Sequence, residues 1–150
     1  MSQSGGGQWS DLGQRLLSGG IAAAVGLWVM WIGGFSFHLL IALVCGIMIW
    51  ELLRMIGAGK RAVAMSAITA FVLLAAMELP PGFALPLLLL PAMIGVSQIE
   101  QHRFTYAIYC AVILVAGYGL TALRDDFGFW WMAWLALVVI VTDILGYFAG

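Results

Sequence analysis

Long apolar runs separated by short polar segments make up almost the whole chain. Runs of about 20 apolar residues can cross roughly 30 Å of hydrocarbon, where only helices and closed barrels satisfy their own backbone. Barrel strands would alternate over segments of about ten residues, whereas segments such as LVCGIMIW and LALVVIV do not alternate. The pattern therefore predicts an all-α polytopic membrane protein with about six transmembrane helices, over residues 16–32, 37–55, 62–77, 83–97, 104–123 and 129–150.

The polar segments divide the chain into two parts. Residues 1–15 form a polar, glycine-rich lead that we expect to be disordered or to lie on the membrane surface. Residues 16–150 form the transmembrane domain. The two prolines of ELPPG end the third run, because proline breaks a helix from within. Pro86 and Pro91 lie inside the fourth run, which we expect to be kinked while neighbouring helices satisfy the freed carbonyls.

Composition agrees with a membrane protein. The chain is 64% hydrophobic and 9% charged, with a mean hydropathy of +1.08, whereas soluble domains carry about 25% charged residues. A net charge of −1 gives no indication of a nucleic-acid partner. Cys45 and Cys110 lie in apolar runs without the spacing of a zinc site or a redox motif, so we interpret them as small packing residues.

The distribution of lysine and arginine predicts the orientation. With a cytoplasmic N-terminus, five of the six cations fall on the cytoplasmic side and only Arg124 falls outside, as the positive-inside rule requires. Five tryptophans then mark the outer interface and Trp50 marks the inner one. The last helix runs inward, so Asp143 lies toward its cytoplasmic half. The cytoplasmic cations are Arg15, Arg54, Lys60, Arg61 and Arg103, and the outer tryptophans are Trp28, Trp31, Trp130, Trp131 and Trp134.

Asp143 is the sharpest candidate for function. A charged aspartate at the centre of a membrane helix costs roughly 2.5–3.5 kcal/mol on insertion scales, and such residues usually face the bundle interior or a water-filled cavity. Helical spacing places Gly146, Tyr147 and Gly150 on the same face, and we interpret the four residues as an inward stripe. The alternatives are that Asp143 caps a break or pairs with a buried arginine, and that the two glycines only permit close helix packing.

The remaining polar residues have simpler interpretations. Glu51 and Arg54 stand three apart, which predicts an interfacial ion pair worth a few tenths of a kcal/mol. His38 lies near the first turn and His102 in the QIEQHR loop, and neither has a partner at helical spacing that would make it a metal ligand. The basic loops attract anionic lipid headgroups, by about 1 kcal/mol per charge. Arg124 and the two aspartates after it resemble a solvated outer turn.

Four segments in order along the chain resemble a known family. They are LGQRLLSG, WELLRM, YGLTALR and VIVTDILGYFAG, and together they resemble the N-terminal half of phosphatidate cytidylyltransferase. In that family a cytoplasmic loop follows a motif of nine residues, which reads (small)-Asp-x-x-(Ala/Gly)-Tyr-(aromatic or Met)-x-Gly. Thr142, Asp143, Gly146, Tyr147 and Gly150 match this motif position by position. The resemblance covers nearly the whole chain from Arg15 onward, and its last motif is the most specific.

The resemblance implies a nucleotidyltransferase that makes CDP-diacylglycerol and pyrophosphate from CTP and phosphatidic acid, in a bacterial inner membrane with its active side cytoplasmic. It implies Asp143 as a cleft-lining catalytic candidate and Gly146, Tyr147 and Gly150 as substrate-binding candidates. The partners it implies are phosphatidic acid, CTP and membrane lipids, with a second copy of the chain as a further candidate.

The resemblance also implies Mg²⁺ or another divalent cation as cofactor. The family's most diagnostic segments, of the types SPGKTW, GDL…ES-x-KR and PGHGG-x-x-DR-x-D, are absent from residues 1–150. We therefore expect the main metal ligands beyond residue 150, and we expect this chain to be inactive alone.

Two other functions stay open at this point. A small transporter or channel subunit could use Asp143 to bind a proton or a cation, and further intramembrane polar residues would then be expected. The third and fourth runs offer little beyond Ser66, Thr69 and prolines. A structural membrane scaffold is the other alternative, and it would leave the cost of Asp143 without an explanation.

Overall fold

The computed structural model describes the backbone of residues 6–150 and the side chains from residue 17 onward. This part of the chain contains six helices and no strand, which confirms the all-α prediction. The helices are α1 (Gly6–Ile32), α2 (Gly34–Met55), α3 (Arg61–Met77), α4 (Pro81–Gln98), α5 (Arg103–Phe127) and α6 (Phe129–Ala149).

The first helix begins earlier than the hydrophobic pattern predicts. The predicted lead covers residues 1–15, of which residues 1–5 lie outside the described residues, whereas residues 6–15 already belong to α1. The other predicted ranges agree with the helices to within a few residues at each end. α4 begins at Pro81, a first helical position at which proline is well tolerated. The helix then continues through Pro86 and Pro91 without a break.

The helices are membrane-spanning in length and composition. Within the described residues, four helices are long and apolar enough to cross a bilayer, namely α2, α4, α5 and α6. The apolar part of α1 (Leu17–Ile32) and α3 are somewhat shorter. At 1.5 Å per residue, the 17 residues of α3 extend about 26 Å, so α3 nearly matches the hydrocarbon thickness. The chain is therefore a polytopic membrane protein.

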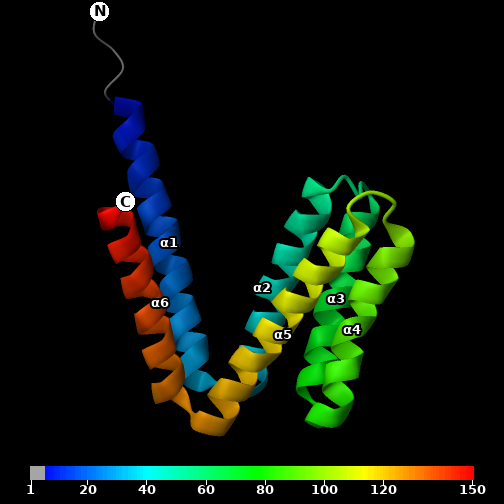
Figure 1. Ribbon diagram of the computed structural model, residues 1–150. Helices are drawn as coiled ribbons and strands as arrows, with labels where there is room; N and C mark the ends of the chain where they lie inside the picture. Colours follow the sequence, from blue (N-terminus) through cyan, green and yellow to red (C-terminus); the bar gives the residue numbers. More distant parts are fainter. Residues whose placement is uncertain (1–5) are drawn as a thin grey trace, which may run out of the picture.

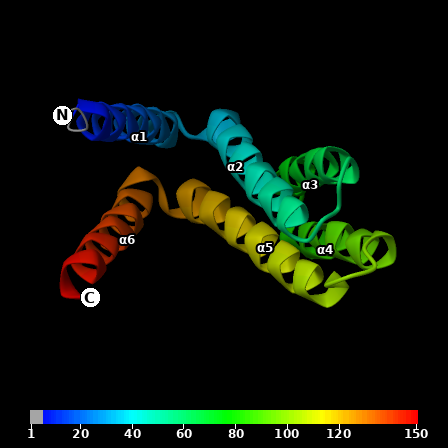
Figure 2. The same ribbon diagram turned by 90° about the horizontal axis from the view of Figure 1, so that it is seen from above.

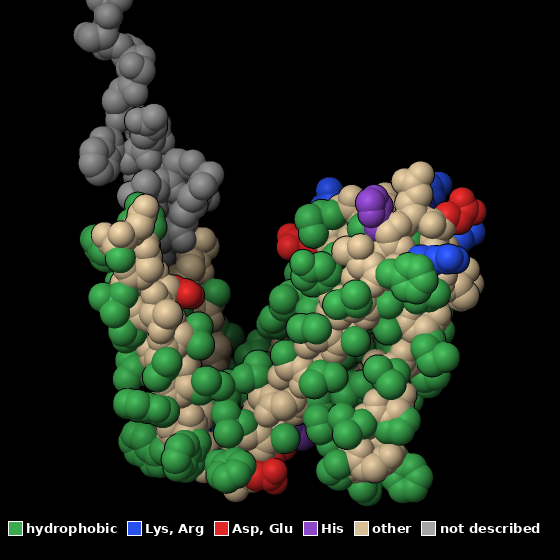
Figure 3. All heavy atoms as spheres, in the orientation of Figure 1, with side chains coloured by type: hydrophobic (Ala, Val, Ile, Leu, Met, Phe, Trp, Pro, Cys, Tyr) green, Lys and Arg blue, Asp and Glu red, His purple; other side chains and the backbone are tan. Residues whose placement is uncertain are grey.

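The described helices form two arms that meet at one end, like a V (Figure 1). Helices α2, α3, α4 and α5 pack into a bundle, in which α2 contacts α3 and α5, and α4 contacts α3 and α5. Helices α1 and α6 form the second arm, which diverges from the bundle in both ribbon views (Figures 1 and 2). The space-filling view shows the opening between the arms (Figure 3).

The hydrophobic core lies inside the four-helix bundle. Its largest fully buried side chains include Ile49, Leu53, Leu73, Leu88 and Tyr106. By contrast, Met132 is the one buried residue among those of α6. Most of the apolar surface of α6 is therefore exposed, as expected for a helix that faces lipid or a further partner.

Glycines allow the closest helix contacts in the bundle. Gly95 of α4 lies directly against the ring of Tyr106 on α5, and a Cβ atom there would overlap that ring. Gly117 of α5 lies against the Cys45 sulfur and Leu73, leaving no room for a Cβ atom either. Small residues at such positions let membrane helices approach each other.

We predict that Gly95→Ala destabilises the bundle by about 1–3 kcal/mol, because the fully buried Tyr106 ring cannot move aside without overpacking. Gly119→Ala is the matched control, since nothing lies within 4 Å of a Cβ atom at Gly119. In the control, the higher helix propensity of alanine should leave stability unchanged or raised by up to about 1 kcal/mol. Thermal unfolding in detergent micelles measures both variants, and equal midpoints would contradict the packing argument.

Candidate functional site

Asp143 lies in the C-terminal half of α6, and its side chain is exposed. The other residues of the stripe are exposed as well: Tyr147 is 85% exposed, and nothing lies within 4 Å of a Cβ atom built on Gly146. Within the described chain, Asp143 makes no hydrogen bond or ion pair. The helix places Asp143, Gly146 and Tyr147 on one face as predicted, with Gly150 just after its end. No described helix covers this face, so the predicted inward packing of the stripe is not formed by residues 17–150.

The cations gather at one end of the bundle, which we call the basic end. It contains the end of α2 and the starts of α3 and α5, with Arg54, Lys60, Arg61 and Arg103. The space-filling view shows Lys and Arg side chains at this end and acidic side chains at both ends (Figure 3). The C-terminus of α6 points the same way as the basic end (Figure 1). Asp143 therefore lies in the half of α6 that is nearer to the basic end.

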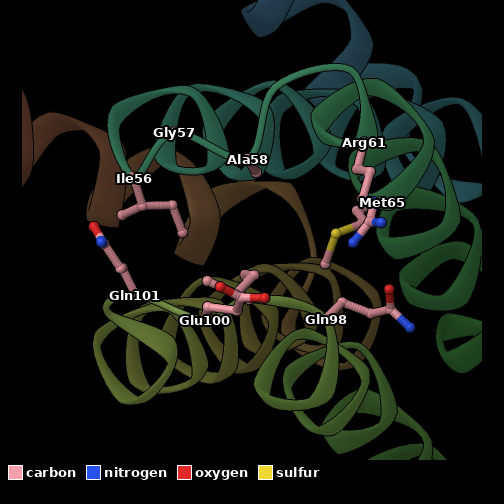
Figure 4. Close-up of a pocket in the computed structure, with 9 residues that line it drawn as sticks. Ile56, Gly57, Ala58, Arg61, Met65, Gln98, Glu100 and Gln101 are labelled. Atoms are coloured by element: carbon pink, nitrogen blue, oxygen red, sulfur yellow. The ribbon is translucent and has the colours of Figure 1, made fainter.

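A pocket of about 380 Å³ opens at the basic end. It lies between the α2–α3 turn and the α4–α5 loop, and its lining includes charged, amide and apolar side chains (Figure 4). The turn above it depends on Gly57 and Gly59, whose φ angles of 78° and 58° lie in the left-handed region that glycine adopts at low cost. The lining residues are Ile56, Gly57, Ala58, Arg61, Met65, Gln98, Ile99, Glu100 and Gln101.

Arg54 pairs differently from the prediction. Its guanidinium carbon lies 4.8 Å from the centroid of the Trp50 ring, which is a cation–π contact. No ion pair joins Glu51 and Arg54 in the described part of the chain, so the predicted interfacial pair is wrong. The two residues line a shallow depression with Met55 instead.

The opposite end of the bundle, which we call the acidic end, contains a hydrogen-bond network centred on His38. Its Nδ1 lies 3.0 Å from an Oε1 of Glu78, and its Nε2 lies 2.7 Å from an Oδ2 of Asp125. His38 is only 8% exposed. Both contacts are hydrogen bonds only when the imidazole carries a proton on each nitrogen or a carboxyl group is protonated. The network therefore ties the start of α2 to the end of α3 and the end of α5.

Arg124 forms a second tie at the acidic end. Its Nε donates to the carbonyl of Met30 at 2.7 Å, and its Nη2 donates to the carbonyl of Trp31 at 3.0 Å. These carbonyls belong to the last turn of α1, and the last carbonyls of a helix have no N–H partner within that helix. A positive charge is also favoured at this end of a helix. Gly33, with φ 70°, lies against this guanidinium and leaves no room for a Cβ atom. The prediction that Arg124 lies in a solvated turn is therefore wrong.

Sequence reasoning missed the His38 network because its members are far apart in the chain. Glu78 lies 40 residues from His38, and Asp125 lies 87 residues away. The signal that could have found it is topological, since the predicted orientation places all three residues at the outer ends of their helices. A histidine and two carboxylates at one membrane face are natural partners, because unpaired charges near the hydrocarbon are costly.

The described residues contain no group of three or more His, Cys, Asp or Glu side chains that could hold a metal ion. Cys45 and Cys110 are both buried in the bundle as free thiols. In the described chain, the hydroxyls of Ser66 and Thr69 donate to the carbonyls of Val63 and Met65 in their own helix. These hydroxyls are therefore engaged in α3 and do not line a polar path.

Comparison with protein families gives one clear result. The model of the cytidylyltransferase family matches residues 13–150. The chain belongs to the cytidylyltransferase family. This membership confirms the family resemblance of the four sequence segments and indicates a CTP-using transferase. Comparisons with curated proteins and with solved structures give no match.

For the acidic end of this cytidylyltransferase, we predict that His38→Asn lowers the free energy of unfolding by about 1–3 kcal/mol, because a shorter side chain cannot reach both Glu78 and Asp125. His102→Asn is the control: the His102 side chain is exposed and makes no hydrogen bond within the described residues. Its φ of 58° is one that asparagine tolerates. Thermal unfolding in detergent micelles compares the two variants. An equal loss of stability in both would contradict the stabilising role of the His38 network.

Proposed function

We propose that this chain is the N-terminal membrane region of a nucleotidyltransferase that makes CDP-diacylglycerol and pyrophosphate from CTP and phosphatidic acid. The observation that carries the proposal is the cytidylyltransferase match over residues 13–150 in a chain built of membrane-spanning helices. CTP is a soluble nucleotide, so the membrane helices are needed for the other substrate. A lipid that carries a phosphate is the acceptor that fits such an enzyme.

In the proposed reaction, a phosphate oxygen of phosphatidic acid attacks the α-phosphorus of CTP. The new O–P bond forms as the bond between the α-phosphorus and the bridging oxygen breaks, and pyrophosphate leaves with that oxygen. Both substrates are anionic, and catalysis of such transfers depends mainly on positioning and on neutralising charge. The basic end supports this role, because four exposed cations lie there at the ends of membrane helices. We propose that this end faces the cytoplasm of a bacterial inner membrane, as the positive-inside rule favours.

Asp143 is proposed to line the reaction cleft from α6. Two observations support this role: Asp143 lies in the half of α6 nearer to the basic end, and no residue of the described chain pairs with it. Gly146 leaves open space beside it, and the exposed Tyr147 adds a hydroxyl on the same face. We propose Gly146, Tyr147 and Gly150 as substrate contacts.

Mg²⁺ or another divalent cation is the proposed cofactor, since it would neutralise the phosphates of CTP. The residues described here do not fit a metal site by themselves. We therefore assign no step of the reaction to a metal ligand in this chain.

To test the proposed reaction, the full-length gene product is incubated in mixed micelles with phosphatidic acid and CTP. Label at the α-phosphate of CTP should enter a lipid product, label at the γ-phosphate should appear in pyrophosphate, and chelation of divalent cations should stop both. Transfer of the γ-label to lipid would instead show phosphoryl transfer and overturn the proposal. Labelling that does not require phosphatidic acid would overturn the assignment of the acceptor.

For the same full-length enzyme, we predict that Asp143→Asn reduces CDP-diacylglycerol formation by roughly tenfold or more, as expected for loss of a charged group from a cleft. Asp126→Asn is the matched control, because Asp126 is exposed at the far end of α5. Its activity should stay near that of the unsubstituted enzyme. Unchanged activity of Asp143→Asn, with normal thermal stability, would remove Asp143 from the proposed cleft.

A further inference from the structure

The pocket at the basic end is formed by two loops that are far apart in the sequence. The α2–α3 turn contributes Ile56 and Ala58, α3 contributes Arg61, and the α4–α5 loop contributes Ile99 and Glu100. In the close-up, Arg61 extends from the start of α3 and Glu100 stands on the facing α4–α5 loop, with Gln98 and Gln101 on either side of it (Figure 4). The lining of the pocket thus combines polar side chains with the buried, apolar Ile99.

The two charged side chains of this pocket do not neutralise each other. No ion pair within 4.0 Å joins Arg61 and Glu100 in the described chain, and neither side chain has a hydrogen bond there. The amides of Gln98 and Gln101 also make no hydrogen bond within the described residues. One cationic, one anionic and two amide side chains therefore border about 380 Å³ of space without using their polar groups on the protein.

One positive and one negative side chain in the lining favour a ligand that carries both charges. A simple anion would be attracted by Arg61 and repelled by Glu100, and a simple cation would meet the reverse. A group that carries both charges a few atoms apart satisfies both side chains and leaves the amides for its oxygens. We infer that the pocket binds a zwitterionic phosphoethanolamine group, with its phosphate at Arg61 and its ammonium at Glu100.

The position of the pocket indicates that this group belongs to a phospholipid. The pocket lies at the ends of membrane helices, where lipid headgroups lie, and Ile56, Met65 and Ile99 give it apolar walls beside the polar groups. A pocket of this size suits a small ligand group rather than a whole lipid, so the acyl chains would remain among the helices. This inference does not require the proposed function, because neither Asp143 nor the substrates CTP and phosphatidic acid take part in it.

The inference is tested on the purified chain in detergent by native mass spectrometry with added lipids. Phosphatidylethanolamine should bind with at least about tenfold higher affinity than phosphatidylglycerol, which lacks the ammonium and is not a substrate of the proposed reaction. Phosphatidylcholine should be weaker than phosphatidylethanolamine, because its ammonium has no N–H to donate to Glu100. Free phosphoethanolamine is a further competitor: effective competition at equal concentration would mean that the ligand is a soluble one and would overturn the lipid assignment.

Variants connect this selectivity to the pocket. Arg61→Gln and Glu100→Gln should each weaken phosphatidylethanolamine binding by about tenfold, the effect of about 1.4 kcal/mol. Glu100→Gln should at the same time strengthen binding of phosphatidic acid, a gain that a misfolded variant could not show. Lys60→Gln is the matched control: it removes the neighbouring positive charge, which does not line the pocket. An equal loss in Lys60→Gln, or phosphatidylethanolamine binding that neither Arg61→Gln nor Glu100→Gln weakens, would overturn the inference.

Discussion

The two ties at the acidic end are the interactions on which the arrangement of the helices depends. His38 joins α2 to the ends of α3 and α5 through Glu78 and Asp125, and Arg124 joins α5 to the last carbonyls of α1. Helices α1 and α6 meet the bundle near this end and diverge from it toward the other (Figure 1). Hydrophobic burial gives little direction to helices in lipid, so the His38 network fixes the ends of three bundle helices relative to one another. The Arg124 contact is the one of these that joins the bundle to the second arm, at the end of α1.

The two ends of the molecule differ in how their polar groups are used. At the acidic end, the charged and polar side chains of His38, Glu78, Arg124 and Asp125 bind one another or the backbone. At the basic end, Arg61 and Glu100 have no protein partner in the described chain, and Asp143 on α6 has none either. The hydrogen-bonded polar groups are thus concentrated at the acidic end, whereas Arg61 and Glu100 at the basic end stay free of protein partners within the described residues.

The hydrophobic pattern predicts the helices well because membrane spans depend on composition over many residues. It also predicts which residues of α6 share a face with Asp143, since that follows from helical geometry alone. It does not predict what packs against a face, so the surroundings of Asp143 and the exposure of Tyr147 became visible only in the structure. The His38 network and the Arg124 tie were missed for a related reason: contacts between residues 40 to 94 positions apart leave no local pattern.

The connections at the acidic end also bear on how the protein enters a membrane. Gly33 alone separates α1 from α2, Gly128 alone separates α5 from α6, and residues 78–80 separate α3 from α4. In the proposed orientation the acidic end lies outside, and a translocation machinery would then carry almost no polar loop across the bilayer. The charged side chains that would cross in that orientation include His38, Glu78 and Asp125, whose mutual contacts would offset part of the cost of moving them.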